Sequence, residues 1–387
     1  MSMTSRERVQ TALHHEEPDR VPIIIGASNA TSMKLKPYLG LKDLLGIQGE
    51  DRYLYDWPEL GSIHPDERIL QRLLSDVRGV LDRAPQAIYH RNRKRHAHTP
   101  YIDDWGIGQE EIEPDVWFPS LHPMAAARSL DDIENYPWPD MHDPTRVAHV
   151  RQVAKRLSQE NQYAIMATPW LLFPFERANA LMGMEHFLPN LVENREFAVA
   201  LLLKITELCK TLMGHFLSEL GKDVDIIKIG DDLGMQSGLL ISPRMYRQVL
   251  KPIHADYIAF IKAHTKAKVF FHTDGDVFDL IDDFIEIGVD ILNPIQTSAG
   301  KMADLVAIKK RYGRNLCLCG AVDTYRILPF GTPEQVRQEV RRVIDILGPG
   351  GGYMVAAVHT ILDEVPAENI LAMVDAVEEF GHYPLGH

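Results

Sequence analysis

The sequence is poor in cysteine, in basic residues and in long apolar runs. Three cysteines among 387 residues cannot form a disulfide framework, and an odd number is typical of a reducing compartment, so we expect a cytoplasmic protein. Lys and Arg total 41 against 54 Asp and Glu, and the formal net charge of −13 argues against nucleic acid as a partner. The longest apolar stretch, residues 164–175, is too short to span a membrane and contains two prolines. The first residues include Arg6, Glu7 and Arg8 and lack the apolar segment of a signal peptide.

Short apolar runs alternate with helical patterns along the whole chain. The runs are residues 20–26, 75–80, 163–170, 224–230, 267–272, 289–294, 315–320 and 352–359. Strands that are buried on both faces of a parallel sheet have nearly continuous apolar sequences. Eight such runs with helices between them predict an α/β protein, a closed (β/α)8 TIM barrel that forms a single domain over residues 1–387.

Several helix ends and one irregular segment can also be located. Thr332, followed by proline and then by glutamine at the third helical position, predicts a capped helix that ends at Gly348 in a left-handed conformation. Ser242 begins another helix, and Thr4 caps a short helical extension at the N-terminus. Residues 84–145 are rich in His, Pro, Trp and Asp and fit no strand–helix unit. We interpret them as an insertion over the barrel that serves as a lid.

Polar and ionisable residues gather at the ends of the predicted strands. Those at the last five strands are Asp231, Asp232, Gln236, His272, Asp274, Asn293, Gln296, Cys319 and His359. In a TIM barrel the C-terminal ends of all strands meet at one mouth, and this mouth holds the active site. We therefore expect these side chains to lie close together.

A metal site is the first hypothesis for this group. Two imidazoles and a carboxylate suit a catalytic zinc with an open fourth position, so we expect His272, Asp274 and His359 to bind Zn²⁺, with Cys319 as a candidate fourth ligand. The alternatives are that each histidine only satisfies its hydrogen bonds, that Asp274 orients His272 without binding metal, and that Cys319 is inert and buried. Of Cys317 and Cys319, which lie on one strand, we expect only one to face the barrel interior.

Other residues are expected to act on the substrate. Asp231 and Asp232 are paired carboxylates of the kind used in general acid–base catalysis, although one of them is expected only to cap the following loop. Trp170, Phe173 and Phe175 form either an apolar wall for a ring or part of the core. The expected catalytic residues are Asp231, Asp232, His272 and His359. The expected substrate-binding residues are Trp170, Arg177, Gln236, Asn293 and Gln296.

Several segments resemble the uroporphyrinogen decarboxylase superfamily. They are residues 3–9, 17–22, 241–246, 272–276, 288–294, 328–333, 350–353 and 365–369. The resemblance extends over most of the chain and is weakest around residues 84–145. It implies a (β/α)8 barrel, in agreement with the eight predicted strands.

One branch of that superfamily contains the true decarboxylases, which bind a tetrapyrrole through an N-terminal Arg-Gln-Ala-Gly-Arg loop. Here residues 26–31 read Gly-Ala-Ser-Asn-Ala-Thr and contain no arginine, so we expect that uroporphyrinogen is not a substrate. Asp76 resembles the catalytic aspartate of this branch, and His359 resembles its final-strand histidine. A decarboxylase of a small carboxylated substrate is therefore the alternative function. It would need Arg78 or Arg177 to hold the carboxylate.

The other branch contains zinc-dependent corrinoid methyltransferases, whose ligands are a His-x-Cys pair at a strand end and a cysteine near the last strand. His272 matches the first ligand, Asp274 stands at the second and His359 lies near the third. Harder ligands favour Lewis-acid action on an oxygen over activation of a thiolate. The resemblance thus implies an O-demethylase that moves a methyl group between a small methoxylated compound and a corrinoid.

The partners follow from the same resemblance. The chain has no Asp-x-His-x-x-Gly motif for cobalamin, so we expect the corrinoid on a separate protein. A second copy of the chain, in a homodimer, is a further candidate partner. A non-enzymatic binding protein with the same pocket remains the last alternative.

Overall fold

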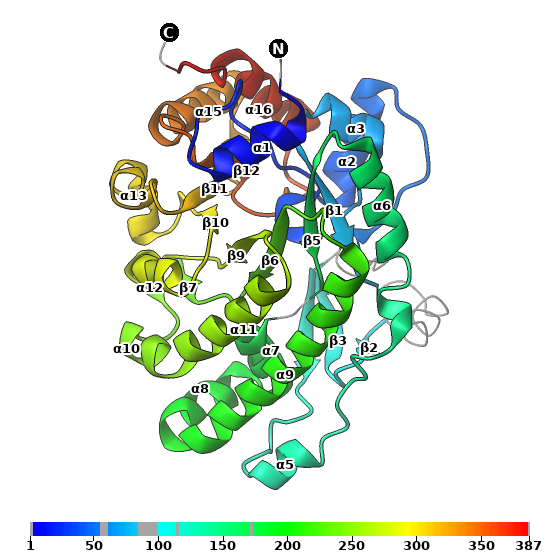
Figure 1. Cartoon of the computed structure of the whole chain (residues 1–387), viewed down its shortest axis with the longest axis vertical. Coiled ribbons are helices and arrows are strands. Elements are labelled where there is room, and N and C mark those ends of the chain that lie inside the picture. The colour runs from blue at the N-terminus through cyan, green and yellow to red at the C-terminus, as the bar shows by residue number, and fades with distance from the viewer. Residues whose placement is uncertain (1–2, 55–60, 84–98, 114–115, 171–172, 386–387) are drawn as a thin grey trace.

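The computed structural model describes residues 3–54, 61–83, 99–113, 116–170 and 173–385. Its centre is a seven-stranded sheet in the order β1-β5-β6-β9-β10-β11-β12, in which every neighbouring pair is parallel. The strands are β1 (Val77–Leu81), β5 (Ala164–Thr168), β6 (Ile226–Gly230), β9 (Lys268–His272), β10 (Ile291–Ile295), β11 (Cys317–Val322) and β12 (Tyr353–Ala357). Seven of the eight predicted strands are thereby confirmed. The sheet curls at the centre of the molecule, with helices around it (Figure 1).

The first predicted strand, residues 20–26, is not a regular strand, although it lies between β12 and β1. Ile23 forms a parallel bridge with Val355, whose N–H donates to Pro22 O (2.8 Å). On the other side, Ile23 O accepts from Asp76 N–H, but Ile23 N–H donates to the Asp76 carboxylate, each at 2.8 Å. Pro22 has no N–H to donate, and a side-chain oxygen replaces part of the backbone ladder. The segment therefore closes the barrel without forming a strand.

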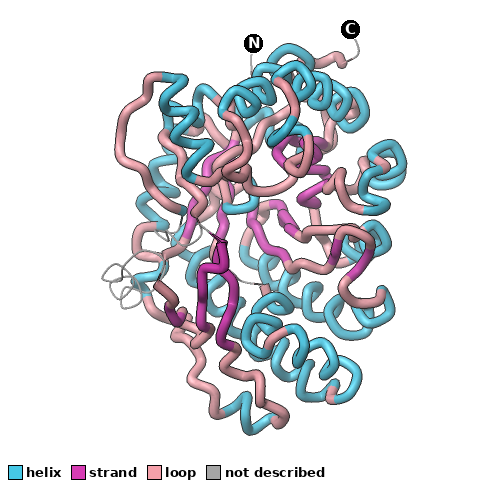
Figure 2. Tube along the Cα trace, turned by 180° about the vertical axis from the view of Figure 1, so that it is seen from behind, coloured by secondary structure: helices cyan, strands magenta, loops and turns pink. Residues whose placement is uncertain are grey.

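Most of the helices surround the barrel on its outer side (Figure 2). The longer ones are α2 (Leu35–Leu45), α3 (Glu67–Arg72), α6 (Val150–Glu160), α7 (Pro174–Met182), α8 (Met184–Glu193), α9 (Arg195–Leu220), α11 (Lys251–His264), α12 (Ile281–Glu286), α13 (Leu305–Tyr312), α15 (Pro333–Leu347) and α16 (Ala367–Phe380). Shorter helices are α10 (Pro243–Met245) and α14 (Ile327–Phe330). None of the described helices has the length and apolar character needed to cross a membrane.

The N-terminal helix α1 (Ser5–Leu13) covers the N-terminal end of the barrel. Its Val9 and Leu13 belong to the apolar cluster inside the barrel, together with Ile226 of β6 and Phe270 of β9. The predicted capping box is confirmed, since the Thr4 side chain accepts from Glu7 N–H. The opposite, C-terminal end of the barrel is left for polar side chains.

The helix predicted after Thr332 is confirmed as α15, with its capping box in place. Its end differs from the prediction, because Gly348 has φ −70° and ψ −45°, which is right-handed helical backbone. A Cβ on Gly348 would lie 2.4 Å from Leu385 Cδ1. Close packing against the C-terminal segment therefore explains this glycine better than a left-handed turn. Ser242 caps α10 as predicted, through a hydrogen bond from Met245 N–H.

The predicted insertion has its own small sheet. Strands β2 (Tyr101–Ile102), β3 (Gly108–Glu113) and β4 (Val116–Leu121) pair antiparallel, and α5 (Leu130–Glu134) follows them. Residues 84–98 and 114–115 of the predicted insertion lie outside the described residues. The insertion packs against α7, since Met124 N–H donates to Leu181 O (2.9 Å) and His122 Nδ1 contacts Ala180 O (2.8 Å).

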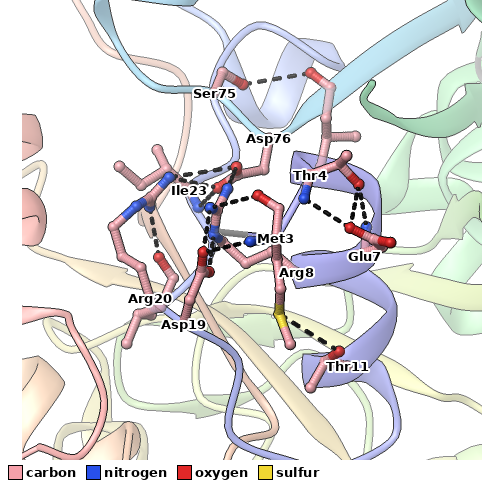
Figure 3. A network of polar contacts seen from close by, with 12 residues as sticks. Met3, Thr4, Glu7, Arg8, Thr11, Asp19, Arg20, Ile23, Ser75 and Asp76 are labelled. Atoms are coloured by element: carbon pink, nitrogen blue, oxygen red, sulfur yellow. Dashed lines mark hydrogen bonds and ion pairs between the residues drawn. The ribbon is translucent and has the colours of Figure 1, made fainter. Parts of the chain in front are cut away.

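Asp76, which was compared with a catalytic aspartate, lies at the wrong end of the barrel for that role. It directly precedes β1 and is fully buried. Figure 3 shows its carboxylate bound by the guanidinium groups of Arg8 (2.6 Å) and Arg20 (3.2 Å). Arg8 also pairs with Asp19 (2.7 Å). This network joins α1 to the segment that closes the barrel, so Asp76 has a structural function.

Candidate active site

His272, Asp274 and His359 converge at the C-terminal mouth of the barrel. His272 is the last residue of β9, Asp274 follows it by two residues, and His359 follows the end of β12 by two residues. One possible ligand atom from each side chain lies within 4.8 Å of the other two. Asp274 Oδ2 is 3.5 Å from His359 Nε2 and 3.9 Å from His272 Nε2. Three donors therefore face a common point, as the sequence predicted.

Asn293 of β10 fixes the orientation of the His272 ring. His272 Nδ1 is 2.7 Å from Asn293 Oδ1, and Asn293 Nδ2 points toward the backbone oxygen (3.5 Å) and the sulfur (3.7 Å) of Cys319. We assign the imidazole proton to Nδ1, which leaves the Nε2 lone pair facing Asp274. Asn293, expected to bind substrate, is fully buried and instead positions His272.

Cys319 is not part of the group of ligand atoms found among the described residues. Burial raises the pKa of its thiol well above the usual value. Both Cys317 and Cys319 belong to the apolar cluster inside the barrel. This corrects the expectation that only one of them faces inward, because residues two apart on a strand point to the same face.

The donor atoms of this cluster fit a cation. Asp274 Oδ1 is buried and has no hydrogen-bond partner among the described residues. Burial, and then the Asp232 carboxylate, raises the pKa of Asp274 to about 8. Burial, and then the charge of Lys228, lowers the pKa of both His272 and His359, which keeps both imidazoles neutral and able to donate a lone pair. Two imidazole nitrogens and a carboxylate oxygen are a donor set that fits Zn²⁺.

Lys228 is a buried cation in the mouth that was not singled out from the sequence. It is the central residue of β6 and is 3% exposed. It lies two positions from Ile226, which faces the barrel interior, so Lys228 faces inward as well. Its Nζ donates to Asn29 Oδ1 (3.1 Å) and lies 4.9 Å from the centre of the Phe173 ring. The available signal was a lysine in the middle of an otherwise apolar strand, Ile-Ile-Lys-Ile-Gly.

Glu176 and Asp232 form a carboxylate pair beside the three converging residues. Asp232 Oδ1 accepts from Asp274 N–H (2.9 Å), and Glu176 Oε1 accepts from Asp232 N–H (3.0 Å). Burial, and then the Asp232 and Asp231 carboxylates, raise the pKa of Glu176 well above its usual value. Burial also raises the pKa of Asp232. Glu176 was not among the predicted site residues, and the direction of its pKa shift favours the protonated form of its carboxyl group.

Asp231 differs from Asp232 in its surroundings. It is fully buried, and its two carboxylate oxygens accept from Phe175 N–H (3.0 Å) and Glu176 N–H (2.8 Å) at the start of α7. His254 Nε2 lies 2.9 Å from the same carboxylate. Asp231 thus caps α7 from a fully buried position. Of the two paired aspartates, Asp232 is the one placed for chemistry.

Neither arginine considered for carboxylate binding is available in the mouth. Arg177 is buried, lies 3.7 Å from Asp103 and stacks 4.8 Å above the Trp105 ring, so it anchors the insertion. Arg78 forms an ion pair with Glu67 (2.8 Å).

The remaining predicted substrate-binding residues have other contacts. Gln296 Oε1 accepts from Gly275 N–H (2.6 Å), which supports the loop that carries Asp274. Gln236 is exposed between two short strands, β7 (Gly234–Met235) and β8 (Gly238–Leu239). The backbone N–H of Trp170 donates to Asp82 Oδ1 (2.8 Å), directly after β1. Burial raises the pKa of Asp82 to about 7, which makes it another ionisable residue at a strand end that was not predicted.

A closed parallel barrel with ionisable side chains at its C-terminal mouth defines an enzyme scaffold of the TIM-barrel class. The sequence model of the family described as "Uroporphyrinogen decarboxylase (URO-D)" matches residues 110–380. The chain therefore belongs to the uroporphyrinogen decarboxylase family.

Relatives with two different activities are similar to the chain. The uroporphyrinogen decarboxylase of Methylococcus capsulatus is 24% identical over 295 residues, which cover 72% of this chain and 76% of that enzyme. The methylated-thiol–coenzyme M methyltransferase of Methanosarcina mazei is 23% identical over 271 residues, 68% of this chain and 67% of that enzyme. The uroporphyrinogen decarboxylase of Psychromonas ingrahamii matches only 20% of this chain and 21% of its own length, at 37% identity.

A solved structure supports the fold. A methyltransferase from Methanosarcina mazei superposes with a TM-score of 0.62 over 98% of this chain and 99% of that one, at 19% identity. At this identity the match establishes the barrel architecture alone.

Proposed function

We propose that the chain is a cytoplasmic, zinc-dependent methyltransferase that demethylates a small methoxylated compound and passes the methyl group to a corrinoid on a separate protein. The observation that carries the proposal is the convergence of His272, Asp274 and His359, where one buried Asp274 oxygen has no hydrogen-bond partner within the described part of the chain. The methyltransferase relative from Methanosarcina mazei supports it, since its named activity is methyl transfer.

His272, Asp274 and His359 would hold the zinc, and Asn293 would fix the orientation of His272 through Nδ1. When bound, zinc supplies a Lewis acid that draws electron density from an ether oxygen and stabilises the oxyanion that leaves. Asp274 stands where a thiolate ligand stands in the thiol-activating enzymes. A carboxylate ligand leaves the site better suited to polarising oxygen than to activating a thiol.

Loss of a methyl group from an ether leaves an alkoxide or phenolate, which requires a proton to depart as an alcohol or phenol. Glu176 and Asp232 are the carboxyl groups that can provide it. Burial and the neighbouring Asp232 and Asp231 carboxylates raise the pKa of Glu176 well above its usual value, which favours its protonated form, and Glu176 Oε1 accepts from Asp232 N–H. Asp232 is connected to the proposed zinc ligands by the hydrogen bond that Asp274 N–H donates to Asp232 Oδ1.

Two measurements on the purified chain test the proposal. Metal analysis should find about one zinc per chain, as expected for a catalytic site with three protein ligands. A methoxylated aromatic with reduced corrinoid, free or on a carrier protein, should yield methylcobamide and the matching phenol. Cob(I)amide and methylcobamide differ in absorbance, so the transfer can be followed directly.

Two results would contradict the proposal. A metal-free preparation that is fully active would remove zinc from it. Faster methylation of a free thiol from methylcobamide than demethylation of any ether would show that the argument from ligand hardness is wrong.

Decarboxylation of a small carboxylated substrate is the second candidate function. It is favoured by Lys228, a buried ammonium in the mouth where a carboxylate could bind, and by the decarboxylase relatives. Release of carbon dioxide from a small carboxylic acid, without any methyl transfer, would select it over the methyltransferase.

A further inference from the structure

Lys228 has unused capacity to bind an anion. An ammonium group has three N–H donors. The described contacts of Lys228 Nζ are one hydrogen bond, to Asn29 Oδ1 at 3.1 Å, and the face of the Phe173 ring at 4.9 Å. With 3% of the residue exposed, water has little access to it. Buried lysines are rare unless they are paired with an opposite charge, because the loss of hydration is costly.

The carboxylates around Lys228 do not provide that pairing directly. Within the described residues, no Asp or Glu oxygen forms an ion pair with Nζ at 4.0 Å or less. Glu176 and Asp232 use oxygens to bind backbone N–H groups, and Asp274 directs Oδ2 toward the two imidazoles. These acids influence Lys228 through space, but they leave its remaining donors without an anionic partner.

Lys228 is also placed close to the proposed reaction centre. In the register of β6 and β9, Lys228 is opposite Phe270, and Gly230 is opposite His272. Lys228 therefore begins one inward-facing layer below His272, and its side chain extends to Asn29, the first residue of the short 3-10 helix η1 (Asn29–Thr31) that follows residues 20–26. The positive charge is near enough to lower the pKa of both His272 and His359.

We propose that Lys228 binds a carboxylate of the substrate and so restricts this site to methoxylated carboxylic acids. The methoxy group of this substrate class rests on the proposed methyltransferase function. The carboxylate of the substrate class rests only on the contacts of Lys228. Neutral methoxylated compounds would leave the buried ammonium unpaired and should bind more weakly.

Binding of matched acid and amide pairs tests this proposal. Calorimetry on the full zinc-containing chain would compare 4-methoxybenzoate with 4-methoxybenzamide, and methoxyacetate with methoxyacetamide. At least one acid should bind about 10- to 100-fold more tightly than its amide, as expected for a charged hydrogen bond that is lost. In Lys228→Met the preference should fall to about 1, with unchanged zinc content. Lys222→Met, which removes an exposed lysine, is the matched control and should keep the preference.

The possible outcomes separate this proposal from the proposed function. Equal binding of acids and amides by the unmodified chain, or no binding of either acid, overturns the role of Lys228 even if Lys228→Met does not fold. A preference that persists in a folded Lys228→Met also overturns it. Methyl transfer from an amide with the same kcat/KM as from its acid would overturn the restriction to acids and leave methyl transfer standing. Tight, Lys228-dependent binding of an acid without methyl transfer would support Lys228 and contradict the methyltransferase.

Discussion

Among the three converging side chains, His272 has a buried hydrogen-bond partner behind its ring. It ends β9, is nearly buried and is held through Nδ1 by a fully buried asparagine. A hydrogen bond behind the ring fixes the orientation of the imidazole before a metal binds. It raises metal affinity because less conformational entropy of the side chain is lost on binding. Asp274 and His359 lie in loops, so His272 is the residue around which the other two are arranged.

We expect His272→Ala to lose its zinc and its activity while keeping the fold, because strand-end side chains of a TIM barrel contribute more to chemistry than to stability. Removing one of three ligands should leave well under one zinc per chain by elemental analysis. His264→Ala, which removes an exposed histidine at the end of α11, is the control. An unchanged zinc content in folded His272→Ala would remove His272 from the ligand set.

Asp82 should make the stability of the chain depend on pH. Its pKa is raised to about 7 in the folded chain, so the folded state holds this proton more tightly than the unfolded state does. The stabilisation is fully present below about pH 4 and is lost as the pH rises through about 7, about 4 kcal/mol in total.

Asp82→Asn mimics the protonated carboxyl group and keeps an acceptor for Trp170 N–H. Between about pH 5 and about pH 8, its free energy of unfolding should therefore fall less than that of the unmodified chain, as measured by urea titration. Parallel pH profiles for the two proteins would show that Asp82 is ionised in the folded state throughout this range.

Helix α7 connects the mouth of the barrel to the insertion. Its first turn is capped by Asp231 and carries Glu176, whose Oε1 accepts from Asp232 N–H, and its Arg177 pairs with Asp103 of the insertion. The two neighbouring aspartates thus have different contacts. Asp231 caps α7, whereas Asp232 is hydrogen-bonded to Glu176 and to the backbone N–H of Asp274. Two consecutive aspartates after β6 therefore stabilise a helix and support the loop of Asp274.

Asp231→Ala should reduce stability more than a change at an exposed aspartate does. It removes a buried carboxylate that accepts from Phe175 N–H, Glu176 N–H and His254, at an expected cost of about 3 kcal/mol in the free energy of unfolding. Chemical denaturation measures the loss. Asp345→Ala on α15 is the control and should change stability by less than about 0.5 kcal/mol. A full-stability Asp231→Ala that is catalytically dead would return Asp231 to the catalytic residues.

The whole barrel depends on a close approach between the irregular closing segment and β1. A Cβ on Gly79 would lie 2.1 Å from Ala27 O, far inside normal contact distance. The Cβ would be fixed to the backbone of Gly79, and the Ala27 oxygen is itself a backbone atom. The contact could therefore be relieved only by moving the backbone of β1 or of Ala27, which directly follows residues 20–26. Gly79 is therefore required for closure by packing, and not by an unusual backbone angle.

We expect Gly79→Ala to destabilise the barrel by about 3 kcal/mol or more, or to prevent folding, because overpacking against backbone cannot be relieved by a rotamer change. Thermal unfolding and circular dichroism measure the effect. Gly214→Ala in α9 is the matched control, since the nearest atom to its new Cβ would be Phe260 Cζ at 3.5 Å, an ordinary contact. That change should be neutral or stabilise by about 0.5–1 kcal/mol. Equal stability of the two variants would contradict the proposed packing.

Much of the site could be predicted because the C-terminal ends of all strands of a TIM barrel lie at the same face. Once His272, Asp274 and His359 were placed at strand ends, the TIM-barrel topology required them to share one mouth. The roles of Asp231 and Lys228 could not be obtained in this way. They depend on which atoms of α7 and of the loop at Asn29 come within hydrogen-bond distance, and those partners lie more than 50 residues away in the chain.

The sequence by itself determined the features that depend on local pattern, namely seven strands, the capped starts of α1 and α15, and the polar strand ends. Apolar periodicity and capping act between neighbours within a few residues, so they can be recognised without the fold. Only the tertiary structure decided that residues 20–26 close the barrel without a regular strand, that Asp76 lies at the far end from the mouth, and that Lys228 is a buried cation within it. Each of these depends on packing and charge between segments distant in the chain, which no local pattern records.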